Sequence, residues 1–197
     1  MNIDIQKFKT YCESRNWIYD DFASEFTFQF RLCRFIESLH KDYDIELESS
    51  IERYGLSNLS KKEIDIDILD ADNNRIAIEI KYIRDSGSHN IGMFDYCEDI
   101  KFLEEIVEKN FNQGIAIIFT TIDKLYTTPK KPLKPKNIEN LELYSAFRIH
   151  KLLEGELTIK TGKMNRSLIL NKQYNLKWID FTDTIKACIV KVVKKVS

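Results

Sequence analysis

Acidic residues alternate with isoleucine in two neighbouring stretches of the sequence. Residues 63–69 read EIDIDIL and residues 75–83 read RIAIEIKYI. Because successive side chains of a strand point to opposite faces, each stretch predicts a strand with one apolar and one polar face. Asp65 lies on the polar face of the first strand, and Glu79 and Lys81 lie on that of the second. Carboxylates and an ammonium group in this pattern suit metal-assisted hydrolysis.

The turn between the two strands decides which acids face each other. A symmetric connection through residues 70–74 places Asp65 opposite Glu79. The same register places Asp67 opposite Ala77, so Asp65 is preferred over Asp67 as a ligand. Opposed carboxylates repel unless a cation lies between them. Two carboxylates are enough for Mg²⁺ or Mn²⁺, which prefer oxygen ligands.

Such a site is suited to cutting phosphodiesters. A divalent cation lowers the pKa of its water and shields the negative charge that develops in the displacement. Lys81 would orient or deprotonate the attacking water. The pattern alone is equally typical of a half-buried hairpin whose outer face is charged, and that alternative stays open at this point.

The surrounding sequence predicts an α/β (α+β) core in the order helix, three strands, helix, strand. A short helix at about 3–15 precedes this core. Apolar spacing and the N-cap residue Ser24 predict the first core helix, to about residue 40. The other core elements are strands at 43–49, 61–69 and 75–83, a helix at 93–109 and a strand at 114–120.

The C-terminal part has a different character. The run TTPKKPLKPKN contains all three prolines and predicts an exposed loop, and period-two stretches after it predict a strand-rich extension. LELYSAFRI, at 141–149, is the first of these stretches. We therefore divide the chain into a core at 1–125, a Lys/Pro-rich loop at 126–138 and an extension at 139–197 packed on the core, forming one domain overall.

The net charge of −1 conceals a gradient. Residues 1–119 hold 14 Lys and Arg against 24 Asp and Glu, whereas residues 120–197 hold 16 against 7. The basic part indicates a polyanionic partner, and its loop supplies candidate nucleic-acid contacts. These candidates are the lysines Lys130, Lys131, Lys134 and Lys136.

The spacing of the acidic motif resembles the PD-(D/E)xK nuclease superfamily, which includes many restriction endonucleases. Asp65 is followed by thirteen residues and then by Glu79-Ile80-Lys81, and the likeness covers residues 24–119. Ile64 stands where the family signature has proline. The runs IAIEIKY, GMFDYCEDIKFLEEI and GIAIIFT also resemble a group of small bacterial and phage proteins of that superfamily.

The resemblance implies a restriction-endonuclease-like core with a mixed central sheet flanked by helices. It implies that Asp65, Glu79 and the carbonyl of Ile80 hold Mg²⁺ or Mn²⁺, and that Lys81 assists the water. Glu25 would be an auxiliary acid, although an acid is also favoured at any helix N-terminus. The expected function is a DNA endonuclease in restriction, phage interference or repair. The alternative is a catalytically silent nucleic-acid-binding or assembly module with the same fold.

Composition and the absence of certain motifs exclude several other classes of protein. With 43% hydrophobic and 31% charged residues, six Gly and three Pro, the chain is neither disordered nor collagen-like. Scattered histidines and the absence of phosphate-binding glycine motifs argue against zinc hydrolases and organic cofactors. Because the sequence has no leader and no membrane span, we expect a cytoplasmic protein. A homodimer is a possible form of it, since two copies related by a twofold axis can cut both strands of a duplex. Four separated cysteines are expected to be packing residues: Cys12, Cys33, Cys97 and Cys188.

Overall fold

A mixed six-stranded sheet forms the centre of the molecule. The computed structural model describes residues 1–17, 24–84, 87, 89–129, 141–149, 151–162 and 164–194. The strand order is β1-β2-β3-β4-β8-β7, with only the β3–β4 pair parallel. The strands are β1 (Asp44–Ser50), β2 (Glu63–Leu69), β3 (Arg75–Ile83), β4 (Gln113–Thr120), β7 (Trp178–Asp180) and β8 (Lys186–Val193).

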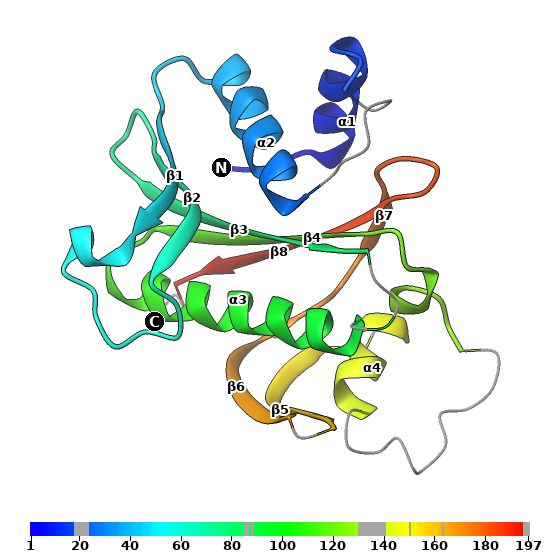
Figure 1. Cartoon of the computed structure of the whole chain (residues 1–197). Helices are drawn as coiled ribbons and strands as arrows, with labels where there is room; N and C mark the ends of the chain where they lie inside the picture. The colour runs from blue at the N-terminus through cyan, green and yellow to red at the C-terminus, as the bar shows by residue number, and fades with distance from the viewer. Residues whose placement is uncertain are drawn as a thin grey trace.

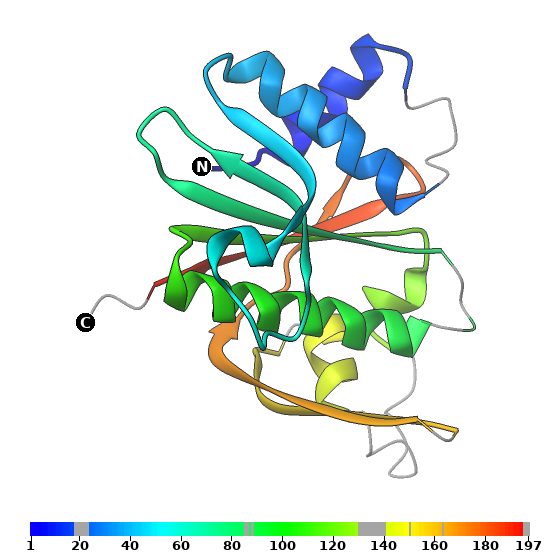
Figure 2. The same cartoon turned by 60° about the vertical axis from the view of Figure 1, so that its left-hand side comes forward.

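Helices cover both faces of this sheet. Helices α1 (Ile5–Ser14) and α2 (Glu25–Leu39) lie on one face, and α3 (His89–Lys109) lies on the other (Figures 1 and 2). Two short 3₁₀ turns, η1 (Ile51–Tyr54) and η2 (Asp123–Leu125), lie in connections. The mixed α and β class and the predicted order of elements between residues 24 and 120 are confirmed.

The C-terminal part adds two strands to the main sheet and a separate hairpin on the α3 side. The strands β7 and β8 extend the main sheet beyond β4, while β5 (Leu153–Thr161) and β6 (Met164–Tyr174) pair as a separate hairpin. This hairpin and helix α4 (Leu141–Arg148) lie below α3 in Figures 1 and 2. The prediction of a strand at 141–149 is wrong. Leu143, Ala146 and Phe147 recur at helical spacing and are buried together, so their packing favours the helix.

The sequence explains how α2 meets the sheet. Ser24 caps the helix by accepting a hydrogen bond from the Thr27 amide, as predicted. Phe28, fully buried, stacks on Phe119 of β4 with ring centroids 3.9 Å apart. The first turn of α2 is thereby held over β3 and β4 by aromatic packing.

Close backbone approach fixes α3 on the opposite face. A Cβ added at Gly114 of β4 would lie 2.8 Å from the Leu103 Cβ, so this strand position needs glycine. The four cysteines are unpaired and buried, in agreement with a packing role. Burial raises the pKa of Cys12 and that of Cys33 to about 12.

Candidate functional site

The candidate site lies where β2 and β3 separate. Four pairs follow the predicted register, including Asp67 opposite Ala77, and the ladder ends at the pair of Ile66 with Ile78. Beyond it, Ile64 packs in the core on the α3 side, whereas Ile66 packs in the core on the α2 side. The strand therefore twists at Asp65, and a fork opens between β2 and β3.

Side chains replace the ladder inside this fork. The Asp65 carboxylate accepts a hydrogen bond of 2.6 Å from the Ile80 amide. In return, the Asp65 amide lies 3.4 Å from Glu79 Oε1. The two predicted metal ligands thus come together as expected, each linked to the backbone of the other's strand.

Helix α2 contributes Glu25 to the same place. Its carboxylate accepts a hydrogen bond of 2.9 Å from the Tyr82 amide and lies 3.2 Å from Lys81 Nζ. Burial would lower the pKa of Lys81, but Asp99 and Glu25 outweigh burial and raise it. Lys81 is therefore an ammonium group at neutral pH, which donates hydrogen bonds.

Two residues of the site were not predicted. Lys61, in the loop before β2, forms ion pairs with Glu79 and, at 3.0 Å, with Asp99 of α3. Burial would lower the pKa of Lys61, but Glu79 and Asp99 outweigh it and raise it. The sequence carried a signal for Asp99. It lies three positions after Tyr96 and four before Leu103, so on a helix it shares the face of these two buried residues. For Lys61 the sequence could suggest a side of the strand but not these two partners.

Two buried acids of the fork, Glu79 and Asp99, are costly to ionise. Glu79 is 1% exposed, and burial followed by the charge of Asp65 raises its pKa well above the ordinary value. Burial likewise raises the pKa of Asp99 to about 6, against the lowering effect of Lys61 and Lys81. Negative charge at this site is therefore only partly offset by the chain's own cations.

Asp67, the competing acid of β2, belongs to a structural contact. It is 4% exposed, accepts a hydrogen bond from the Tyr54 hydroxyl and lies 3.0 Å from Arg75 Nη1. Opposite it in the ladder, Glu46 of β1 pairs with Arg53. An arginine thus neutralises each acid of this pair, which leaves Asp65 as the acid available at the fork.

The donor set of the fork fits a hard divalent cation. Five carboxylates converge around two lysines there: Glu25, Glu48, Asp65, Glu79 and Asp99 around Lys61 and Lys81. Among the buried side chains that the structure describes, the Gln29 Oε1 and Asp99 Oδ2 atoms lack a hydrogen-bond partner. Within the described ranges, no three His, Cys, Asp or Glu side chains are grouped closely enough to hold one ion. An ion here would take two carboxylates and neutral oxygens.

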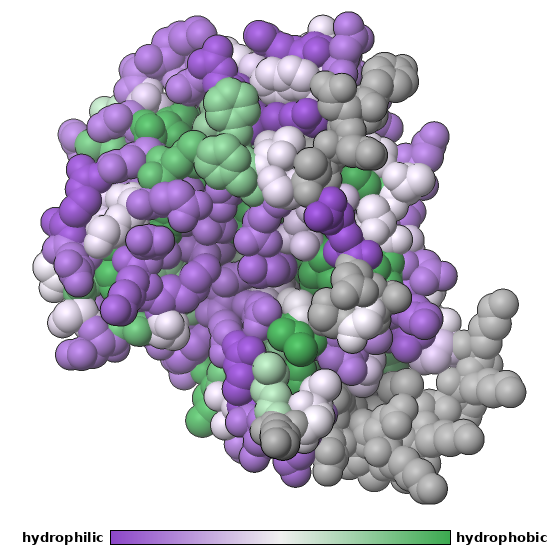
Figure 3. Space-filling model, in the orientation of Figure 1, coloured by the Kyte–Doolittle hydropathy of each residue, from purple (hydrophilic) through white to green (hydrophobic). Residues whose placement is uncertain are grey.

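A cavity of about 320 Å³ opens beside the ion pair of Glu25 and Lys81. It is also lined by Tyr82, Arg84 and the first turns of α3 near Gly92. Hydrophilic side chains cover the band of surface between α2 and α3 on the face shown in Figure 3. The cavity itself is lined by charged side chains together with Ile83 and Ile91.

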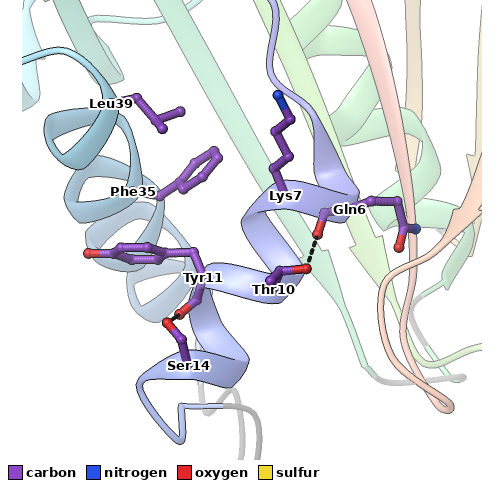
Figure 4. A pocket seen from close by; sticks show the side chains of 7 residues that line it. All are labelled: Gln6, Lys7, Thr10, Tyr11, Ser14, Phe35 and Leu39. Carbon is purple, nitrogen blue, oxygen red and sulfur yellow. Dashed lines mark hydrogen bonds between the residues drawn. The ribbon is translucent and has the colours of Figure 1, made fainter.

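A second hollow, of about 420 Å³, lies between α1 and α2. Figure 4 shows the Tyr11 ring reaching from α1 to α2, while Phe35 and Leu39 point from α2 into the space between the helices. The hydroxyls of Thr10 and Ser14 donate within α1, to the carbonyls of Gln6 and Tyr11, and the Tyr11 hydroxyl donates to the Arg34 carbonyl of α2. This hollow shares no lining residue with the fork and offers no acid for catalysis.

Comparison with known proteins gives no assignment, since no family model, no curated protein and no solved structure matches the chain. The predicted nucleic-acid contacts Lys130, Lys131, Lys134 and Lys136 lie outside the described residues. In the part of the chain that is described, no helix is both long and apolar enough to cross a membrane.

Proposed function

We propose that this protein is a Mg²⁺- or Mn²⁺-dependent endonuclease that hydrolyses phosphodiester bonds in DNA. The observation that carries the proposal is the convergence of Asp65 and Glu79 in the fork, with the ion pair of Lys81 and Glu25 two residues further along β3. The observed order of helix, three strands, helix and strand supports the resemblance of residues 24–119 to the PD-(D/E)xK superfamily. The choice of DNA rests on that resemblance.

The chain's own residues divide the work. Asp65, Glu79 and the Ile80 carbonyl would hold the cation, which supplies charge neutralisation and activates water when bound. Lys81 would donate a hydrogen bond to the attacking water or to a phosphate oxygen. Glu25 acts as a positioning residue, because it holds Lys81 Nζ and the Tyr82 amide together. The cavity beside this pair would take the phosphate next to the one that is cut.

A cleavage assay tests the proposal directly. Purified protein is incubated with supercoiled plasmid, linear duplex, single-stranded DNA and RNA, in Mg²⁺, Mn²⁺ or chelator. We expect metal-dependent cleavage of DNA that falls about 100-fold or more in Lys81→Ala. The matched control is Lys62→Ala, which removes an exposed lysine next to the site and should cleave normally.

One observation favours the alternative of a silent binding module. Lys61 pairs with both Glu79 and Asp99, so the chain supplies a cation of its own to two of the acids. A module that only binds nucleic acid would need no metal cation in addition to this lysine. Binding without cleavage in every metal, equal in wild type and Lys81→Ala, would support this alternative and overturn the endonuclease.

A further inference from the structure

Two phenylalanines of α2 are exposed beside the candidate site. Phe26 is 57% exposed and Phe30 is 46% exposed, whereas every other phenylalanine that the structure describes is at most 4% exposed. The two are four positions apart, so their rings lie on one side of the helix, one turn from each other. Apolar side chains lie on the surface over α2 on the face shown in Figure 3. Phe26 directly follows Glu25, which contacts the Lys81 ammonium, so the exposed pair begins at the edge of the site.

A tryptophan continues this aromatic surface away from the site. The half-buried Trp17 ring lies beside that of Phe30, with centroids 6.5 Å apart. Arg31 of α2 donates a hydrogen bond to the Trp17 carbonyl, and its guanidinium lies 5.5 Å from the centre of the Trp17 ring. Tyr11 of α1 packs edge-on against the same ring. These contacts hold Trp17 in place, so Phe26, Phe30 and Trp17 form a succession of rings, the aromatic row.

An arginine without an acidic partner lies near each end of the aromatic row. Arg84 lines the cavity beside the site together with Glu25, the residue before the first ring. At the other end, the guanidinium of Arg15 lies 5.8 Å from the centre of the Trp17 ring. Both arginines are exposed, and within the described residues neither forms an ion pair. The surface thus offers positive charge at its ends and aromatic rings between them.

Nucleic acid with unpaired bases fits this arrangement. Arginines contact phosphates, and aromatic rings stack on bases, which is how many proteins hold single strands. In a double helix the faces of the bases are covered by their neighbours, so a duplex could reach the arginines but not the rings. Another protein is the other common occupant of an exposed apolar surface. The unpaired cations at both ends of the row favour a polyanion.

We infer that the aromatic row binds the unpaired bases of a single DNA strand, whose phosphates contact Arg15 and Arg84. This inference rests on the proposed function and names its substrate class, which is single-stranded DNA or the unpaired arm of a duplex. Glu25 joins the row to the fork, because it precedes the first ring and holds Lys81. A strand that lies along the row is therefore led to the fork.

Fluorescence anisotropy in Ca²⁺, with labelled single-stranded and duplex oligonucleotides, tests the row. Phe26→Ala/Phe30→Ala should bind the single strand about 30-fold or more weakly, while its affinity for the duplex stays within about twofold of the wild type. Phe26→Leu/Phe30→Leu keeps apolar side chains without the rings and should show most of the same loss. The control Leu39→Ala/Ile169→Ala removes two side chains that are 55% and 58% exposed outside the row and should bind like the wild type.

Because every substituted residue is exposed, all these variants should melt close to the wild type. Unchanged binding of the single strand by Phe26→Ala/Phe30→Ala would contradict the inference. A dimeric wild type that this variant converts to a monomer, with DNA binding unchanged, would also contradict it, because the row would then be an interface between copies. Both results leave the proposed endonuclease standing. Conversely, single-strand binding that depends on the row, without cleavage in any metal, would support the row and overturn the proposed function.

Discussion

Asp99 shows how much stability the site gives up at neutral pH. Its pKa is about 6 in the folded protein, mainly because of burial, against an ordinary value of 3.8. Between these values the folded protein holds a proton that the unfolded chain has lost. The contribution of Asp99 to stability therefore falls as the pH rises from about 4 to about 6, and the loss is complete above that range.

The variant Asp99→Asn should remove this cost, because asparagine has no proton to lose. We expect the free energy of unfolding to rise by about 2–3 kcal/mol at pH 7.5 and to change little at pH 4. Urea unfolding at the two pH values measures this. Glu108→Gln, on the exposed side of the same helix, is the control. A gain of the same size at both pH values would show that the charge of Asp99 is not the cause.

Residue spacing predicted the meeting of Asp65 with Glu79 because the two-residue period and a short turn determine which side chains face each other. The same logic would have paired Glu48 with Asp65, but the left-handed backbone of Glu48 leaves no trace in the sequence. The strand predicted at 61–69 placed Lys61 on the face of Asp65, but β2 begins at Glu63, so Lys61 reaches Glu79 and Asp99 from the loop before it. The sequence could suggest its side of the strand but not these two partners.

At the scale of elements, α3 anchors the β5–β6 hairpin through one buried acid. Glu104, 1% exposed, accepts hydrogen bonds from the amides of Asn171 and Lys172 at 3.0 Å and from the Tyr174 hydroxyl at 2.9 Å. These groups of β6 lie beside α3, where they have no strand partner on that side. Glu104 thus substitutes for a neighbouring strand.

Glu104→Ala should leave buried donors of β6 unpaired and lower the free energy of unfolding by about 3 kcal/mol. Hydrogen exchange should show the loss of protection first in β5 and β6. Glu108→Ala breaks only an exposed pair with Lys172 and should cost less than about 0.5 kcal/mol. Equal effects of the two variants would mean that the hairpin is not anchored at Glu104.

Element prediction succeeded where periodicity was long and failed where it was short. The helix at 93–109 was recognised from its apolar spacing, but α3 begins at His89, four residues earlier, where no apolar repeat marks it. The eight residues of α4 fit both the helical period of 3.6 residues and the strand period of two. Residues 186–193 form β8, and the edge of β4 offers them eight backbone pairs.

The two halves of the molecule differ in charge, and the sheet joins them. The acids of the fork lie on β1, β2, β3, α2 and α3, all in the part with a net charge of −10. The part with a net charge of +9 contributes β8 and β7 to the far side of the same sheet. A polyanion would be repelled by the acidic half in the absence of metal, so its attraction must come from the basic half.

The salt dependence of nucleic-acid binding tests the loop lysines as one unit. If Lys130, Lys131, Lys134 and Lys136 each neutralise a duplex phosphate, replacing all four with Gln should reduce the slope of log affinity against log salt by about 3 to 4. Fluorescence anisotropy with a labelled duplex in Ca²⁺, across a range of salt concentrations, measures this slope. The control replaces four exposed lysines elsewhere: Lys7, Lys41, Lys151 and Lys194. Because both variants lose the same total charge, an equal reduction in slope would mean that net charge, and not the loop, holds the nucleic acid.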